Sequence, residues 1–291
     1  MTSDRTKAAR DLLAFYREAG VDALLGEEPV NRLAGEAQPI ALAPHPDSAG
    51  PEPDGASGGS KFESYTLQPA APSVSRMAPA NAPPPPDIAA GAAREAAAGA
   101  QTLDDLRAIL ERFDGCALKA TASRLVFADG NPQARLMFVG EAPGAEEDRE
   151  GLPFVGRSGK LLDRMIAAIG LDRSSVYIAN IIPWRPPGNR TPTPQEAAIC
   201  LPFMRRQIEL ADPDILVCLG GPSAQALLGA KEGILRTRGR WFNFNAGGRD
   251  IRAMATLHPA YLLRQPLQKR LAWRDFLAIK KALEAAGTSS P

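Results

Sequence analysis

The chain of 291 residues is long enough for one or two domains. Its 34 Lys and Arg nearly balance its 33 Asp and Glu, but 8 basic and 13 acidic residues precede Gln101, whereas 26 basic and 20 acidic residues follow from there. The second part is therefore expected to meet an anionic partner. Three cysteines are too few for a secreted disulfide framework, and neither a signal peptide nor an apolar run of about 18 residues is recognisable, so we expect a cytoplasmic protein.

The first hundred residues divide into two segments. Residues 1–32 are predicted to hold a short helix, because apolar residues recur at helical spacing between Ala8 and Ala19. We interpret it either as a docking peptide or as a helix that packs on its own domain. Residues 33–100 hold 12 of the 27 prolines together with Gly-Ala-Ser tracts, so they bury too little apolar surface to offset their ordering entropy. A disordered or polyproline II linker is expected there.

The folded part is expected over residues 101–287. Thr102 is predicted to cap a first helix that contains Leu106 and Leu110. Short apolar runs then alternate with amphipathic segments, in the order 136–139, 161–169, 176–182, 194–210, 215–219, 223–228, 251–257 and 268–285. Apolar strands separated by helices predict an α/β domain, a parallel sheet covered by helices on both faces. Ligands of such sheets bind outside the carboxyl ends of the strands, which is where we expect the chemistry.

The first strand is followed by a tight turn and an acidic run. Gly140, Glu141, Ala142 and Gly144 form a glycine-proline turn whose backbone amides are able to face an anion or a carbonyl, and the acids Glu146–Asp148 follow. Carboxylates beside a polyanion weaken its binding, so a catalytic role is favoured over a solvated surface.

Two further segments offer groups that recognise a planar ring. Phe154 lies between glycines in a loop, where it either packs in the core or offers its face to a base. Asn180 ends the second strand, and an amide there either makes a turn or reads the edge of a base with a donor and an acceptor side by side. The stiff cationic loop that carries Arg185 and Arg190 is typical of a phosphate contact.

The last strand leads into a histidine. His258 is one of only two histidines, and its place at the carboxyl end of a strand favours a functional role. Leu262 and Leu263 follow, either as core residues or as an apolar wedge between bases beside Arg264.

Taken in order, these segments resemble the uracil-DNA glycosylase superfamily, most closely its family 4. The resemblance covers residues 106–283 and rests on the strings Gly140–Asp148, Pro153–Gly159, Asn180–Pro194 and His258–Arg264. It implies a three-layer α/β/α sandwich around a four-stranded, mainly parallel sheet. It also implies hydrolysis of the N-glycosidic bond of deoxyuridine in single- or double-stranded DNA, with the base flipped into a pocket and an abasic site left behind. No lysine nucleophile is evident, so the enzyme is expected to be monofunctional.

The same resemblance implies roles for individual residues. Phe154 would stack on uracil, Asn180 would read its O4 and N3 edge, and His258 would hydrogen-bond O2. Either Glu141 or Glu147 would place the attacking water or stabilise the positively charged sugar, and the choice between them is open. Backbone amides of Gly140, Ala142 and Gly144 would approach the base, with DNA contacts expected from Arg185, Arg190, Leu262, Leu263 and Arg264.

One departure from the family concerns its [4Fe-4S] cluster. The resemblance implies four cysteine ligands, but the corresponding positions read Phe113, Cys116, Trp184 and Cys200. Because such clusters use four ligands, we expect no cluster and no other cofactor in this chain, with the aromatic side chains packing in its place. Cys218 matches no ligand position and is expected to be a core residue.

Two other functions stay open. The first is a non-catalytic DNA-binding repair module of the same fold. The second is a glycosylase for another deaminated base, such as hypoxanthine or xanthine. Besides DNA, a repair or replication protein is expected to bind at the N-terminal helix or at the linker. The chain is expected to be a monomer that works beside the nucleoid of a bacterial-type cell.

Overall fold

The computed structural model describes residues 86–287, and the predicted helix over residues 1–32 and the linker up to residue 85 lie outside the described residues. Within 86–287 the strands form one sheet of six, in the order β1-β3-β2-β4-β6-β5. The strands are β1 (Asp129–Gly130), β2 (Leu136–Gly140), β3 (Tyr177–Asn180), β4 (Ile215–Leu219), β5 (Trp241–Ala246) and β6 (Arg249–Thr256).

The four inner strands, β3, β2, β4 and β6, are parallel to one another and confirm the predicted apolar strands. The two outer strands pair antiparallel with them, so the expected sheet of four strands is wrong in its strand number. Neither edge has a continuous apolar run: β1 has only two residues, and Phe244 is the one buried residue of β5. The residues of an edge strand do not have to be buried on either face. The sequence of such a strand therefore lacks the continuous apolar run that identifies the inner strands.

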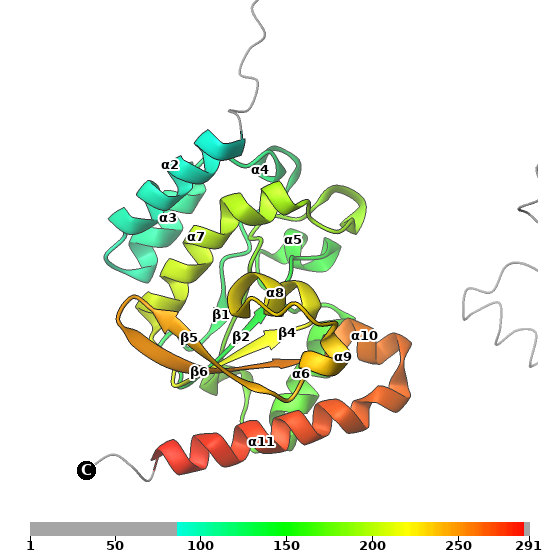
Figure 1. The fold of residues 1–291 in the computed structure, drawn as a ribbon. Coiled ribbons are helices and arrows are strands. Elements are labelled where there is room, and N and C mark those ends of the chain that lie inside the picture. Colours follow the sequence, from blue (N-terminus) through cyan, green and yellow to red (C-terminus); the bar gives the residue numbers. More distant parts are fainter. Residues whose placement is uncertain (1–85, 288–291) are drawn as a thin grey trace, which may run out of the picture. The chain divides into compact units, whose positions relative to one another are not determined.

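Helices cover both faces of this sheet (Figure 1). In chain order they are α2 (Pro86–Gly99), α3 (Leu103–Arg112), α4 (Leu118–Thr121), α5 (Ala145–Glu150), α6 (Arg157–Ala168), α7 (Pro194–Ala211), α8 (Gly221–Leu228), α9 (Ile234–Thr237), α10 (Pro259–Arg264) and α11 (Lys269–Gly287), with 3-10 turns η1 (Arg173–Ser175), η2 (Pro187–Asn189) and η3 (Pro266–Gln268). None of these helices is long and apolar enough to cross a bilayer.

Side chains of the central strand alternate between two apolar layers. Leu136 and Phe138 of β2 join the cluster made with α6 and α11, whereas Met137 and Val139 join the one made with α7 and α8. Figure 1 shows α6 and α11 on one face of the sheet and α7 and α8 on the other. The three-layer α/β/α fold is therefore confirmed.

Helix α2 corrects the expected linker. Residues 33–100 are predicted to be disordered, but Pro86–Gly99 form a helix that packs against α7. Ala89, Ala93 and Ala97 are buried at helical spacing along one face. Alanine is the best helix former and its small side chain permits close helix packing, so an Ala-rich composition is compatible with a packed helix as well as with a linker.

Helices α3 and α7 each begin with a capping box formed by a threonine. The predicted cap at Thr102 is confirmed, since its Oγ1 accepts a hydrogen bond of 3.0 Å from the Asp105 amide and its own amide donates to the Asp105 carboxylate at 3.0 Å. Thr193 and Glu196 begin α7 in the same way, with distances of 3.2 and 2.7 Å. The second box fixes the point at which the arginine-rich loop after β3 ends.

Candidate active site

A cavity of about 650 Å³ opens at the carboxyl ends of the four parallel strands. Its walls come from Glu141–Gly144 after β2, Asn180 of β3, Leu219–Pro222 after β4, and Leu257 and His258 after β6. The loop that holds Phe154, the first turn of α6, the loop over residues 186–192, Ile234 and residues of α10 add to these walls. The predicted location of the chemistry is therefore the location of a cavity large enough for a small ligand.

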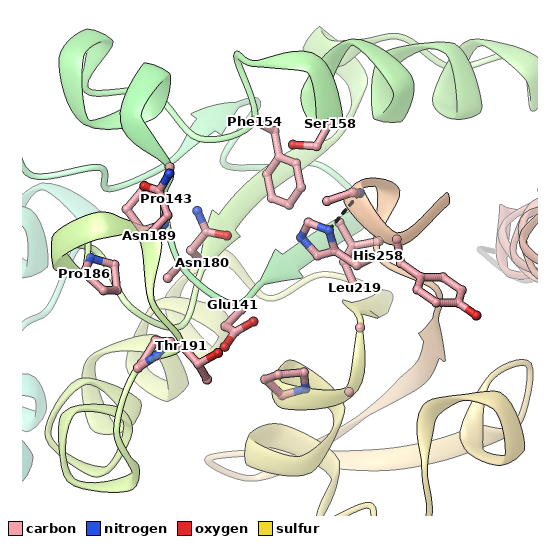
Figure 2. A pocket seen from close by; sticks show the side chains of 18 of the residues that line it. Glu141, Pro143, Phe154, Ser158, Asn180, Pro186, Asn189, Thr191, Leu219 and His258 are labelled. Atoms are coloured by element: carbon pink, nitrogen blue, oxygen red, sulfur yellow. Dashed lines mark hydrogen bonds between the residues drawn. The ribbon is translucent and has the colours of Figure 1, made fainter. Parts of the chain in front are cut away.

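Asn180 presents an amide that nothing in the described part of the chain satisfies. The residue is 2 % exposed, and neither Nδ2 nor Oδ1 has a hydrogen-bond partner there. Leaving such a group unpaired costs about 1–3 kcal/mol, which a ligand with a matching donor and acceptor would recover. Figure 2 shows the amide facing the space between Phe154, Glu141 and His258.

Gly140 makes room for this amide. A Cβ at that position would lie 2.4 Å from Asn180 Oδ1 and 2.7 Å from Phe154 Cζ, distances that real Cβ atoms do not adopt. The expected approach of the Gly140 backbone to the site thus has a steric basis, because only glycine leaves both side chains where they are.

Phe154 lines the same cavity as Asn180. Its ring lies 5.5 Å from the His258 ring, centroid to centroid, with 30° between the planes (Figure 2). Its backbone has a φ of 54°, in the left-handed region that bulky residues rarely adopt. An apolar aromatic face held at a strained position on the wall of a cavity favours a stacking role over simple core packing.

His258 caps α10 with its ring. Nδ1 accepts a hydrogen bond of 3.1 Å from the Ala260 amide, so the ring proton of the neutral form is on Nε2. Burial and, to a smaller extent, the charge of Arg264 lower the pKa of His258 to about 4, although Glu147 acts in the opposite direction. At neutral pH the ring is therefore an uncharged imidazole with an Nε2–H donor.

Glu141 and Glu147 have different surroundings. Burial raises the pKa of Glu141, which lines the cavity and whose carboxylate accepts no hydrogen bond from residues 86–287. Glu147 Oε2 instead accepts from the Gly144 amide at 3.1 Å, and its Oε1 accepts from Val155 at 3.1 Å and Gly156 at 2.9 Å. Glu147 thus ties two loops of the site together, whereas Glu141 is free to face a ligand.

The two loop arginines have partners in the loop or in the first turn of α7. Arg190 forms a double ion pair with Glu196, at 2.8 and 2.6 Å, and Arg185 donates to the Asn189 side chain at 2.7 Å. Arg190 lines the cavity, while Arg264 lines both this cavity and an open depression of about 570 Å³ beside it. Of the three predicted DNA-contacting arginines, Arg190 is ion-paired and Arg185 is hydrogen-bonded, whereas the Arg264 side chain has neither kind of partner among the described residues.

The two leucines of α10 lie on different faces of the helix. Leu262 is 1 % exposed and packs with Leu257 and Ala272, so the expectation that it contacts DNA is wrong. Consecutive residues of an α-helix point about 100° apart, and the core-facing position falls on Leu262. Leu263 is 37 % exposed and lines the open depression, where a wedge between bases would have to stand.

Several lining residues escaped the sequence analysis. Leu219–Pro222 line the cavity because β4 ends there, which the strand-end rule would have found. Gly220 has a φ of 98°, and a Cβ on it would lie 3.2 Å from the His258 Cβ. Ser158 and Tyr261 stand at the rim on α6 and α10, and no sequence signal marks them.

The residues at the expected cluster position do not fit a [4Fe-4S] cluster. Cys116 and Cys200 are buried with their sulfurs 3.9 Å apart, but no third His, Cys, Asp or Glu joins them in the part of the chain that the structure describes. Trp184 is fully buried in the same apolar cluster, and the Phe113 ring packs edge-on against Phe203 with 4.9 Å between centroids. Two thiols cannot replace the four that such a cluster uses.

Comparison with known proteins identifies the family. A model of the uracil DNA glycosylase superfamily matches residues 127–277. The Type-4 uracil-DNA glycosylase of Archaeoglobus fulgidus is 38% identical over 195 residues, 66% of this chain and 96% of that protein. The Type-4 enzymes of Thermotoga maritima and Saccharolobus solfataricus are 38% and 39% identical, over 61% and 63% of this chain and 93% and 87% of their own lengths. The chain therefore belongs to the uracil-DNA glycosylase superfamily, with type-4 enzymes among its relatives.

Proposed function

We propose that this chain is a monofunctional uracil-DNA glycosylase, which hydrolyses the N-glycosidic bond of deoxyuridine and leaves an abasic site. The observation that carries the proposal is the unsatisfied Asn180 amide, buried in one cavity with an aromatic face and a neutral histidine. The O4 and N3–H edge of uracil offers an acceptor beside a donor, the complement of a carboxamide. The similarity to Type-4 uracil-DNA glycosylases supports the same substrate.

The reaction separates charge, and the site has a group for each end. As the bond breaks, its electron pair passes to uracil N1 and spreads to O2, while the sugar becomes an oxocarbenium ion. His258 donates its Nε2–H to O2, and one such donor in a preorganised site is worth on the order of 3 kcal/mol. A water then adds to C1′ and gives up a proton, for which Glu141 is the acceptor.

The partners of the two carboxylates support one choice between them. Both carboxylates line the cavity, but Glu141 orients the water and faces the positive sugar, because its oxygens accept no hydrogen bond from the described residues. Glu147 acts through the loops that it joins, since three backbone amides already occupy its carboxylate. Glu141→Gln should therefore lower the rate of the chemical step without loosening the loops.

We also propose that catalysis needs no iron–sulfur cluster. Support comes from Trp184 and Phe113, which pack in the same apolar cluster as the buried pair Cys116 and Cys200. Anaerobic purification, an absorbance scan and an iron assay test this. About four irons per chain would contradict it.

The chain is further proposed to act as a monomer on DNA, beside the nucleoid. Arg264 and Leu263, both exposed beside the cavity, support contact with a DNA strand that is single or double.

The test is an oligonucleotide with one deoxyuridine, incubated with the protein and then treated with alkali. Wild type should cleave it, Asn180→Ala and His258→Ala should be at least about 100-fold slower, and Asn245→Ala, an exposed asparagine on β5, serves as the matched control. A panel with hypoxanthine and xanthine detects another base preference. Tight binding without cleavage of any substrate would instead identify a non-catalytic module.

A further inference from the structure

One arginine outside the cavity holds the loop that carries the stacking ring. Arg173 Nη1 donates to the Phe154 carbonyl at 3.1 Å, and Nη2 donates to the Pro153 carbonyl. The same guanidinium is anchored by two carboxylates, Asp129 through Nε and Asp163 through Nη1 at 2.7 Å. Arg173 is absent from the cavity wall, so its contact with the site passes entirely through the backbone of this loop.

The backbone of the loop that carries Phe154 is strained, so other groups have to hold its conformation. Phe154 adopts a φ of 54°, which an aromatic residue keeps only where its surroundings determine it. Behind the loop, a Cβ on Gly159 would lie 1.7 Å from the Phe154 carbonyl oxygen, so α6 approaches as closely as glycine permits. The carbonyl is thus enclosed by the first turn of α6 and by Arg173, and its direction fixes where the ring points.

Arginine suits this position better than lysine. A planar guanidinium presents several donors in fixed directions, enough for two carbonyls and two carboxylates at once, whereas an ammonium is a compact point charge with three donors. Arg173 also begins η1, the turn that leads directly into β3 and so to Asn180. The guanidinium therefore reaches the Phe154 loop from the turn that precedes β3.

We propose that Arg173 is a positioning residue for base recognition: it holds the strained backbone of Phe154 so that the ring lies parallel to a base bound at Asn180. This inference rests on the proposed glycosylase function. Its consequence is that loss of Arg173 acts through Phe154 alone and leaves the affinity for DNA nearly unchanged, because the guanidinium is committed to the loop and its two anchors.

A double-mutant cycle tests the inference. Single-turnover cleavage of a deoxyuridine oligonucleotide and the dissociation constant for its abasic product are measured for wild type, Arg173→Gln, Arg173→Lys, Phe154→Leu and the double variant Phe154→Leu/Arg173→Gln. Arg173→Gln should slow cleavage about tenfold when Phe154 is present, but less than about twofold in the Phe154→Leu background. The same substitution should change the dissociation constant for the abasic product less than about twofold. Arg173→Lys should restore part of the rate. Equal losses in both backgrounds would overturn the proposal.

Arg206→Gln is the matched control. Arg206 is buried to the same degree, with 26 % of its side chain exposed against 25 % for Arg173, and it likewise joins a carbonyl, that of Ala100, to a carboxylate, Glu209. It lies on α7, away from the cavity. A comparable loss of cleavage in Arg206→Gln would assign the effect to general destabilisation and contradict the positioning role.

Two readouts keep the inference separate from the proposed function. If wild type leaves deoxyuridine intact, the glycosylase proposal has failed, and the crystal structure of Arg173→Gln still tests the hold on Phe154: its φ should leave the left-handed region. An unchanged Phe154 conformation would overturn the inference. Should Arg173→Gln fail to fold, Asp163→Asn removes one anchor and should give a smaller loss that also vanishes in the Phe154→Leu background.

Discussion

The uncharged state of His258 predicts a specific dependence of stability on pH. Its pKa is about 4 in the folded protein, chiefly because of burial, against an ordinary value of 6.5. Between these two values the unfolded chain binds a proton that the folded chain does not, so the free energy of unfolding rises with pH in this window. The contribution is fully present above pH 6.5 and is lost as the pH falls toward 4.

The size of the effect follows from the shift. Each pH unit within the window is worth about 1.4 kcal/mol, which gives about 2 kcal/mol between pH 6.5 and 5. This is an upper bound, because one edge of the ring faces the cavity and is reached by water. An effect of that size is readily measured in a protein whose total stability is about 5–15 kcal/mol.

His258→Asn isolates the contribution. Asparagine keeps an acceptor at the start of α10 for the Ala260 amide but does not titrate. Urea unfolding followed by circular dichroism at pH 7.5, 6.0 and 5.0 should show wild type losing up to about 2 kcal/mol more than the variant. Parallel curves for the two proteins would refute the assignment of a neutral, buried imidazole.

Three further predictions concern the shape of the site and its supports. Gly140→Ala should fold normally yet cleave on the order of 100-fold more slowly, measured in single turnover, because the added methyl displaces the base-reading amide; a wild-type rate would contradict this. Leu262→Ala should lower the unfolding free energy by about 2–5 kcal/mol, because this side chain is buried in the core. Leu263→Ala should leave the unfolding free energy nearly unchanged but weaken cleavage of duplex DNA, and the reverse pattern would contradict the assignment of Leu262 to the core and Leu263 to the surface. Cys116→Ser/Cys200→Ser should cost about 1–3 kcal/mol of stability but keep the cleavage rate within about twofold, whereas an inactive folded variant would point to a role for the thiols in catalysis.

The sequence predicts the inner sheet and the place of the site well. Runs such as Ile215–Leu219 are buried on both faces, so each appears as a continuous apolar string with a definite start and end. Asn180 and His258 follow such runs, and the geometry of parallel strands brings their ends together. These features depend on local pattern plus one general rule of topology.

Other features depend on contacts that no local pattern encodes. The helix over Pro86–Gly99 exists because its alanines meet α7, and composition alone does not distinguish it from a linker. Glu141 and Glu147 are the same residue type in the same string, and only the three amides that reach Glu147 separate their roles. The importance of Arg173 is likewise visible only when the Phe154 carbonyl is seen beside it.

The central claim is that Asn180, Phe154 and His258 recognise a flipped uracil and assist its departure. Release of free uracil from an oligonucleotide with one deoxyuridine, quantified beside the abasic site that remains, tests this most directly. Wild type should release one uracil for each abasic site formed, and the double variant Asn180→Ala/His258→Ala, still folded and still binding DNA, should release almost none. An intact strand with wild type, or an undiminished rate with the double variant, would contradict the account.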